Sequence, residues 1–207
     1  MCCAACLGPN AETSVLVDSS PVVPDADKTT TSVKKVEATP VLTDDGKTIE
    51  VSVSGPDLAD SIVLDTCDDS AAHICKINPG PFENTSVKAG MYIKKVNSST
   101  SNFRAELHNA KSGKVTVTVQ RPTLFKVSCR KYDDLGMKTK LTENGISLCV
   151  AEVKAGPIKI WNKANPDKAV QPFDRLIEVN GVTGASSSLV EAIKAHKQME
   201  LTFSRCS

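Results

Sequence analysis

The chain has 207 residues, of which 40% are hydrophobic and 24% charged, and its formal net charge is +1 at pH 7. This length accommodates one large or two small domains. A near-neutral charge without a polybasic block argues against nucleic acid as the main partner, and no apolar run approaches the roughly 18–20 residues that span a bilayer. The N-terminus lacks the pattern of a secretory signal, so we expect the eight cysteines to be reduced rather than to form a disulfide framework.

Residues 1–40 show no sustained hydrophobic periodicity, and polar residues and proline dominate residues 18–39. Such a stretch buries too little apolar surface to offset its ordering entropy, so the sequence predicts a disordered N-terminal tail. The tip carries Cys2, Cys3 and Cys6. Clustered terminal cysteines are candidate S-acylation sites, and two or more acyl chains hold a soluble protein at a membrane. A plain tail and a soft-metal site are the alternatives, although these thiols lack the paired spacing of a structural zinc site.

Residues 41–122, the first repeat, alternate short apolar strand patterns with turns. Phe103 and Leu107 stand four residues apart, which is typical of a short helix with one apolar stripe. Alternate valines of the last strand are expected to face inward. The expected strands are Thr48–Val53, Ser61–Asp65, His73–Ile77, Met91–Val96 and Val115–Arg121.

Residues 123–207, the second repeat, show the same order with clearer signals. An Asn-Gly pair within Glu143–Gly145 predicts a hairpin turn, and residues 154–172 are expected to form a longer irregular connection. The alternation at the end of the chain places Met199 and every second residue after it inward. The expected strands are Phe125–Cys129, a segment through Leu141, Ile146–Val153, Leu176–Val179 and Met199–Arg205.

A helical pattern begins at Ser186. Ser187 or Ser188 can cap its N-terminus, and Glu191, three residues after Ser188, completes a possible capping box. We expect His196, near the helix end, to complement the terminal carbonyls.

No catalytic signature competes with this doubled unit. The chain has three histidines and lacks the nucleophile-elbow, zinc-protease and phosphate-loop motifs. His73 and Cys75 would share a strand face, and with Cys67 they are the best candidates for a Cys/His enzyme or a metal pair. Ordinary packing is the favoured interpretation, because a ligand set needs more convergent groups. The sequence therefore predicts no catalytic residue, no cofactor and no metal.

The second repeat resembles a PDZ domain over residues 123–206. Leu135–Met137 stands where that family has its Gly-Leu-Gly-Phe-type loop, and Asp174–Gly181 is similar to the family's strand signature. Ser186–His196 matches the long helix, and Met199–Arg205 the closing strand. The first repeat is similar only in the order of its elements and in its last three pieces.

The resemblance implies a mainly β fold with short helices. It divides the chain into a disordered tail (residues 1–40), a degenerate PDZ-like domain (residues 41–122) and a PDZ-like domain (residues 123–207). Each domain is expected to be a partly open β-barrel of roughly five or six strands, with one or two helices.

PDZ domains bind the extended C-terminus of another protein as an added strand, between the second strand and the long helix. The resemblance implies that the amides of Leu135, Gly136 and Met137 hold the peptide carboxylate, since Gly136 lets the backbone form an anion nest. Arg130 or Lys131 would add charge assistance. The other implied peptide-binding residues are Lys138 and Thr139 on the strand, Leu141, Val190 and Ile193 in the apolar pocket with Met137, and Ser186 at the first helix position. A bulky replacement of Gly136 is expected to abolish peptide capture and to leave the fold largely intact.

The second repeat departs from the family at three positions. Phe173 stands where the family usually has Gly, so the local turn is expected to differ. Asp134 replaces the first loop glycine, and its carboxylate would oppose an incoming peptide carboxylate unless it points away. Ser186 replaces the His that the family uses to select Ser or Thr in the ligand, so that preference is not carried over.

The first repeat departs further. Its candidate loop contains Asp57 and Asp60, and Arg104 occupies the helix position that Val190 has in the second repeat. We therefore expect the first domain to bind weakly or to serve structurally, and the second to be the main binder.

Together these features predict a non-enzymatic, cytoplasmic scaffold or adaptor that binds C-terminal peptides of partner proteins and lies at a membrane if its tail is acylated. A small Cys/His-dependent enzyme and a lipid-anchored membrane-tethering protein are the alternatives. Lipid-anchored tandem PDZ-like proteins of the Golgi-matrix type have a similar layout, but they carry a glycine directly after the initiator Met, where this chain has Cys2. The sequence does not indicate an oligomeric state.

The acylation hypothesis predicts that replacing Cys2, Cys3 and Cys6 together by Ala releases the protein from membranes, because the acyl chains supply the anchor. Fractionation of cells into membrane and soluble parts measures this. Unchanged membrane association of the triple variant would end the hypothesis.

Overall fold

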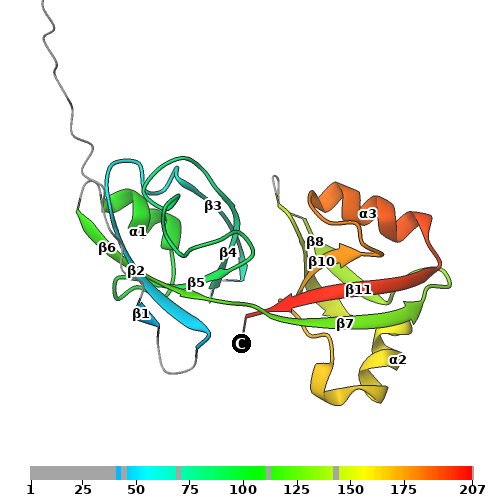
Figure 1. Cartoon of the computed structure of the whole chain (residues 1–207). Helices are drawn as coiled ribbons and strands as arrows, with labels where there is room; N and C mark the ends of the chain where they lie inside the picture. Colours follow the sequence, from blue (N-terminus) through cyan, green and yellow to red (C-terminus); the bar gives the residue numbers. More distant parts are fainter. Residues whose placement is uncertain (1–40, 43–45, 69–70, 111–112, 142–144, 207) are drawn as a thin grey trace, which may run out of the picture. The chain divides into compact units, whose positions relative to one another are not determined.

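The computed structural model describes residues 41–42, 46–68, 71–110, 113–141 and 145–206, which lie in one compact unit, Val36–Ser207. These residues form two antiparallel sheets and three short α-helices (Figure 1). Neither sheet closes on itself among the described residues, which confirms the predicted mainly β class with partly open barrels. No described helix is long and apolar enough to cross a membrane. The predicted disordered tail and the centre of the predicted Asn-Gly turn lie outside the described residues.

Six strands form the first sheet, in the order β1-β2-β6-β5-β4-β3. Val51 of β2 pairs with Val117 of β6, and alternate residues of both strands are buried, as the valine pattern predicts. Phe103 and Leu107 of the predicted helix are buried in the same core. The elements are β1 (Val41–Leu42), β2 (Thr48–Ser54), β3 (Ile62–Asp68), β4 (Ala71–Ile77), β5 (Tyr92–Val96), α1 (Phe103–Asn109) and β6 (Lys114–Gln120).

Five strands form the second sheet, in the order β7-β11-β10-β9-β8. Met199, Leu201 and Phe203 of β11 are buried, as predicted, in a core that is separate from the first. Each repeat therefore folds around its own apolar side chains. The elements are β7 (Thr123–Arg130), β8 (Met137–Lys140), β9 (Leu148–Val153), α2 (Pro157–Ala164), the 3₁₀-helix η1 (Pro166–Lys168), β10 (Arg175–Val179), α3 (Ser186–Ala195) and β11 (Gln198–Arg205).

Two local predictions in the second repeat are wrong. The connection expected to be irregular contains α2, because Pro157 suits the first turn of a helix, where its missing N–H costs nothing, and Ile158 is buried in the core. Helix α3 begins at Ser186 after Ala185 and has no side-chain cap hydrogen bond. The serines predicted to cap it lie inside its first turn, and the capping box does not form.

The turn before β10 keeps a glycine-like backbone although the family's glycine is absent. Phe173 has a φ of 72°, a region that side chains other than glycine rarely occupy, and its side chain is exposed. Next to it, the buried Asp174 accepts hydrogen bonds from Arg205 Nη2 at 2.6 Å and from the Gln171 amide at 2.7 Å. Asp174 thereby ties the turn to the last strand.

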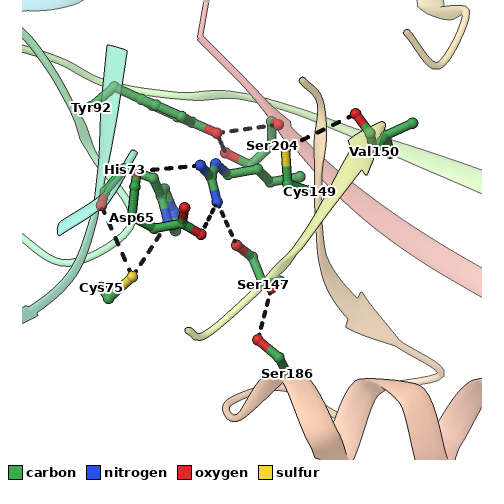
Figure 2. A network of polar contacts seen from close by, with 10 residues as sticks. Asp65, His73, Cys75, Tyr92, Ser147, Cys149, Val150, Ser186 and Ser204 are labelled. Carbon is green, nitrogen blue, oxygen red and sulfur yellow. Dashed lines mark hydrogen bonds and ion pairs between the residues drawn. The ribbon is translucent and has the colours of Figure 1, made fainter. Parts of the chain in front are cut away.

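A buried ion pair joins the two sheets within the compact unit (Figure 2). Arg175 of β10 is 1% exposed, and its Nη1 donates to Oδ2 of Asp65 in β3, which is 3% exposed. The same guanidinium lies 3.3 Å from Ser147 Oγ. Arg175 lies in the segment that resembles the family's strand signature, and its partner belongs to the other repeat.

Tyr92 and His73 extend this network from the first sheet (Figure 2). Tyr92 Oη lies 2.9 Å from Ser204 Oγ of β11, and burial raises the pKa of Tyr92 to about 12. The ring of His73 packs against that of Tyr92, with centroids 5.1 Å apart. Burial, followed by the nearby Arg175 guanidinium, lowers the pKa of His73 to about 3, so the imidazole stays neutral beside the ion pair.

The cysteines differ in state. Cys75 and Cys129 are free thiols, whereas Cys149 of β9 is disulfide-bonded. The expectation of reduced thiols is therefore wrong at Cys149. A disulfide requires that the fold bring two sulfurs together, which local sequence patterns do not specify.

Replacing Arg175 with Met is expected to lower the free energy of unfolding by about 3–5 kcal/mol, because it leaves the Asp65 carboxylate buried without its guanidinium. Urea denaturation of the full chain measures this loss. Adding Asp65→Asn to Arg175→Met should recover part of it, since the uncompensated charge is then removed.

The matched control is Lys126→Met, which breaks an ion pair with Glu200 that is exposed on both sides. Because solvent screens such a pair, the control should change the unfolding midpoint far less. A loss as small for Arg175→Met as for the control would contradict a structural role for the buried pair.

Candidate functional site

Strand β8 is the last strand of its sheet and pairs only with β9 among the described strands. Its residues alternate: Met137 and Thr139 are half-buried, and Lys138 and Lys140 are exposed. An edge strand carries backbone N–H and C=O groups that a further strand can pair with. The structure therefore leaves the predicted peptide-pairing strand with a free edge.

The loop before β8 is held in one conformation by backbone hydrogen bonds. The carbonyl of Gly136 accepts from the Lys154 amide at 2.7 Å, and that of Leu135 accepts from the Ile158 amide at 3.1 Å. Leu135 is buried in the core, and Gly136 has a φ of 71°, which glycine adopts without strain. The short helix α2, which the sequence does not predict, thus supports the loop.

The loop amide at the centre of the predicted nest already has an acceptor. The Gly136 amide donates to Oδ1 of Asp134 at 2.7 Å. Asp134 is exposed, but its carboxylate points toward the nest rather than away from it. One of the three amides predicted to bind a peptide carboxylate is thus used within the chain.

Helix α3 carries apolar side chains that pack against the same core as β8. Val190 and Ile193 are partly exposed and pack against the second core, as Met137 does. Ser186, one of the implied peptide-binding residues, is buried, and its Oγ donates to the Ser147 carbonyl at 2.8 Å. Its hydroxyl therefore fixes the start of α3 beside β9 (Figure 2).

The remaining predicted residues are exposed or have other partners. Leu141 is 59% exposed. Arg130 is exposed and lines a separate depression with Ile160 and Trp161. Lys131 Nζ donates to the carbonyls of Ile193 and Lys194 at the end of α3, so it caps this helix.

His196 behaves as predicted. Its Nδ1 lies 3.0 Å from the Ala192 carbonyl, a favourable place for a basic side chain at a helix C-terminus.

The first repeat has a cavity of about 1030 Å³ at the corresponding place, between β3 and α1. Asp60 and Thr66 line it from the loop and the strand, and Phe103, Arg104 and His108 line it from the helix. The sequence predicts a degenerate site here because of its charged residues. Of those charged residues, Asp60 and Arg104 line the cavity, which is wide enough for a ligand. The charged residues therefore do not fill the space between β3 and α1.

His73 and Cys75, the candidates for chemistry, are both buried in β4. Cys75 Sγ lies 4.0 Å from His73 Nδ1. Burial raises the pKa of the Cys75 thiol, whereas a nucleophilic thiol needs a lowered pKa and access to substrate. The described residues contain no group of three or more His, Cys, Asp or Glu side chains placed to hold a metal ion. The side chain of Cys67 lies outside the described part.

No family model and no curated protein matches the chain. It is similar to the solved structure of INAD PDZ45 in complex with NG2 peptide, with 17% sequence identity, a TM-score of 0.35, and coverage of 77% of this chain and 89% of that chain. It is also similar to the complex structure of INAD PDZ45 and NORPA CC-PBM, with 17% identity, a TM-score of 0.34, and coverage of 77% and 91% respectively. At these values neither structure bears on the function of this chain.

The expectation that a bulky residue at Gly136 leaves the fold intact is wrong. A Cβ atom there would stand 2.7 Å from both the Ala155 carbonyl oxygen and Gly156 Cα, and this contact with backbone cannot be relieved by a side-chain rotation. We expect even Gly136→Ala to destabilise the protein by roughly 2 kcal/mol or more, from the clash added to an unfavourable φ. Thermal or urea unfolding measures the change.

Gly181→Ala is the matched control, because Gly181 also has a positive φ, 84°, but no atom lies within 4 Å of the position that its Cβ would take. This variant should lower the free energy of unfolding by about 1 kcal/mol, which is the cost of the unfavourable φ without a clash. Equal losses for the two variants would show that the approach of Gly136 to Gly156 is not what constrains the loop.

Proposed function

We propose that this protein is a non-enzymatic adaptor that binds an extended segment of a partner protein as an added strand along β8. The observation that carries this proposal is the free edge of β8 among the described strands, together with partly exposed apolar side chains of β8 and α3 that pack against the same core. Strand addition at such an edge supplies affinity through main-chain hydrogen bonds and specificity through alternate side chains.

The side chains around this edge suit such a ligand. Met137, Val190 and Ile193 offer partly exposed apolar surface, which would bury an apolar side chain of the partner. Lys138 Nζ lies 3.4 Å from Glu152 Oε2 across the β8–β9 pair, and both side chains are exposed. Because solvent screens this ion pair, breaking it when a ligand binds would cost little free energy. Affinity would come from the backbone and the apolar edge, with the lysines keeping an unoccupied strand soluble.

The cavity beside α1 supports a second binding site in the first repeat. The sequence ranks the second repeat as the main binder, and this ranking stays a prediction. Two sites within one compact unit would raise the effective concentration of one ligand near the other. This is the physical advantage of an adaptor over a single module.

The membrane anchor also stays a prediction, together with the cytoplasmic or membrane-peripheral location. Cys2, Cys3 and Cys6 lie outside the described residues. If they are acylated, the partner captured at β8 would be concentrated at a membrane surface. Membrane tethering as the main role is the alternative that the fractionation experiment bears on.

Val190→Arg tests the groove. The charge is expected to weaken peptide binding at least about tenfold, which corresponds to roughly 1.4 kcal/mol, because a guanidinium would replace apolar surface at the ligand side chain. The measurement is fluorescence polarisation with peptides that the full chain enriches from randomised displayed libraries. Circular dichroism checks the fold, and Glu191→Arg, on an exposed position of the same helix, is the control. Equal affinities for wild type and Val190→Arg would place binding elsewhere.

A further inference from the structure

We propose that Asp134 determines the specificity of the β8 groove by making it select an internal extended segment of its partner over a free C-terminus. This inference rests on the proposed function and concerns the same site. It replaces the C-terminal peptide expected from the sequence with a chemically different ligand, one that brings no carboxylate to the loop.

The first step concerns the Gly136 amide, which already donates to an acceptor within the chain. The Gly136 amide donates to the Asp134 carboxylate at 2.7 Å, and hydrogen bonds to a charged acceptor are stronger than neutral ones. A peptide carboxylate would have to displace Asp134 from this amide and then lie close to a second negative charge. Like charges within a few ångströms repel even where water screens them.

The second step is the rigidity of the loop. Gly136 cannot turn its amide toward a ligand while its carbonyl is held by Lys154 and the neighbouring Leu135 carbonyl by Ile158. The contact between Gly136 and Gly156, which leaves no room for a Cβ, also holds the backbone in place. The loop therefore offers a ligand carboxylate no alternative arrangement of the same amide.

The third step concerns the contacts of the two nearby cations, Lys131 and Arg130. Lys131 donates to the carbonyls of Ile193 and Lys194, so its ammonium group is engaged at the end of α3. Arg130 is exposed and lines the depression beside Trp161 instead. Among the described residues, neither of the two cations that the sequence suggests for charge assistance forms an ion pair with Asp134.

The first repeat satisfies the equivalent amide in another way. Ser61 directly precedes β3 as Gly136 precedes β8, and its carbonyl accepts from the Asn78 amide at 2.9 Å. The Ser61 amide donates to the Asp57 carbonyl at 3.1 Å. Asp60, beside it, is exposed and lines the cavity. Both repeats thus use this amide internally and add negative charge around it, so an internal segment, which needs only the strand edge, fits both.

The test displays randomised peptides in two formats, one with a free C-terminus and one embedded between two folded flanking domains, and selects each against the full chain. Wild type is expected to enrich binders from the embedded library. Enriched sequences, synthesised as free acids and as C-terminal amides, should bind wild type with affinities within about threefold of each other. Asp134→Ala, which frees the amide, should favour the free acid by about tenfold or more, and Asp134→Asn, which keeps an acceptor but removes the charge, should fall between.

Asp133→Ala is the matched control, because Asp133 is an exposed neighbour that carries the same charge, and it should behave as wild type. Enrichment of free C-termini by wild type, with a large loss of affinity on amidation, would overturn the inference and leave strand addition standing. The same would follow if Asp134→Ala did not change the preference between acid and amide. If neither library yields binders to wild type or to Asp134→Ala, the proposed function itself fails.

Discussion

The ion pair between Arg175 and Asp65 is the interaction on which the arrangement of the two sheets depends. Both side chains are almost fully buried, and each comes from a different repeat. Desolvation of two charges offsets much of their attraction, so such a pair adds little net stability but is costly to break. Removing one of the two charges would leave the other buried without its partner. The neutral His73 and the contact between Tyr92 and Ser204 are the further polar groups of this interface between the two repeats.

This coupling has a consequence for binding. Asp65 lies on β3, one of the two edge strands of the first sheet among the described strands, and Arg175 lies on β10, at the centre of the second. The first repeat therefore uses a residue of its own edge strand to hold the second repeat. Strand β3 thus contributes to the contact between the two sheets, and a ligand added to the first repeat would pair with the same strand. The divergent first repeat therefore has a structural role in addition to the binding that its cavity suggests.

Close packing of backbone, rather than side-chain chemistry, shapes the candidate site. Gly136 and Gly156 approach so closely that neither tolerates a Cβ, and α2 supplies the amide of Ile158 to the loop. The sequence marks Gly136 as important for its flexibility. The structure shows that its small size matters as much, because the residue is fixed against another glycine twenty positions along the chain.

Hydrophobic alternation and turn residues are local properties, and they were enough to predict the strands that contain Val51, Val117 and Leu201, the helix that carries Phe103, and the class of fold. Helix α2 was missed because its apolar stripe is short and follows a glycine and a proline, which locally resemble a loop. Local patterns do not predict the partner of Ser186, because the Ser147 carbonyl is distant in sequence. The same holds for Arg175, because its buried partner Asp65 lies 110 residues away in the chain. The sequence by itself determined which residues alternate into two cores, since burial follows local periodicity. Only the tertiary structure decided where polar groups find their partners, including the Asp134 carboxylate at the Gly136 amide, because hydrogen bonds depend on atomic positions that periodicity does not specify.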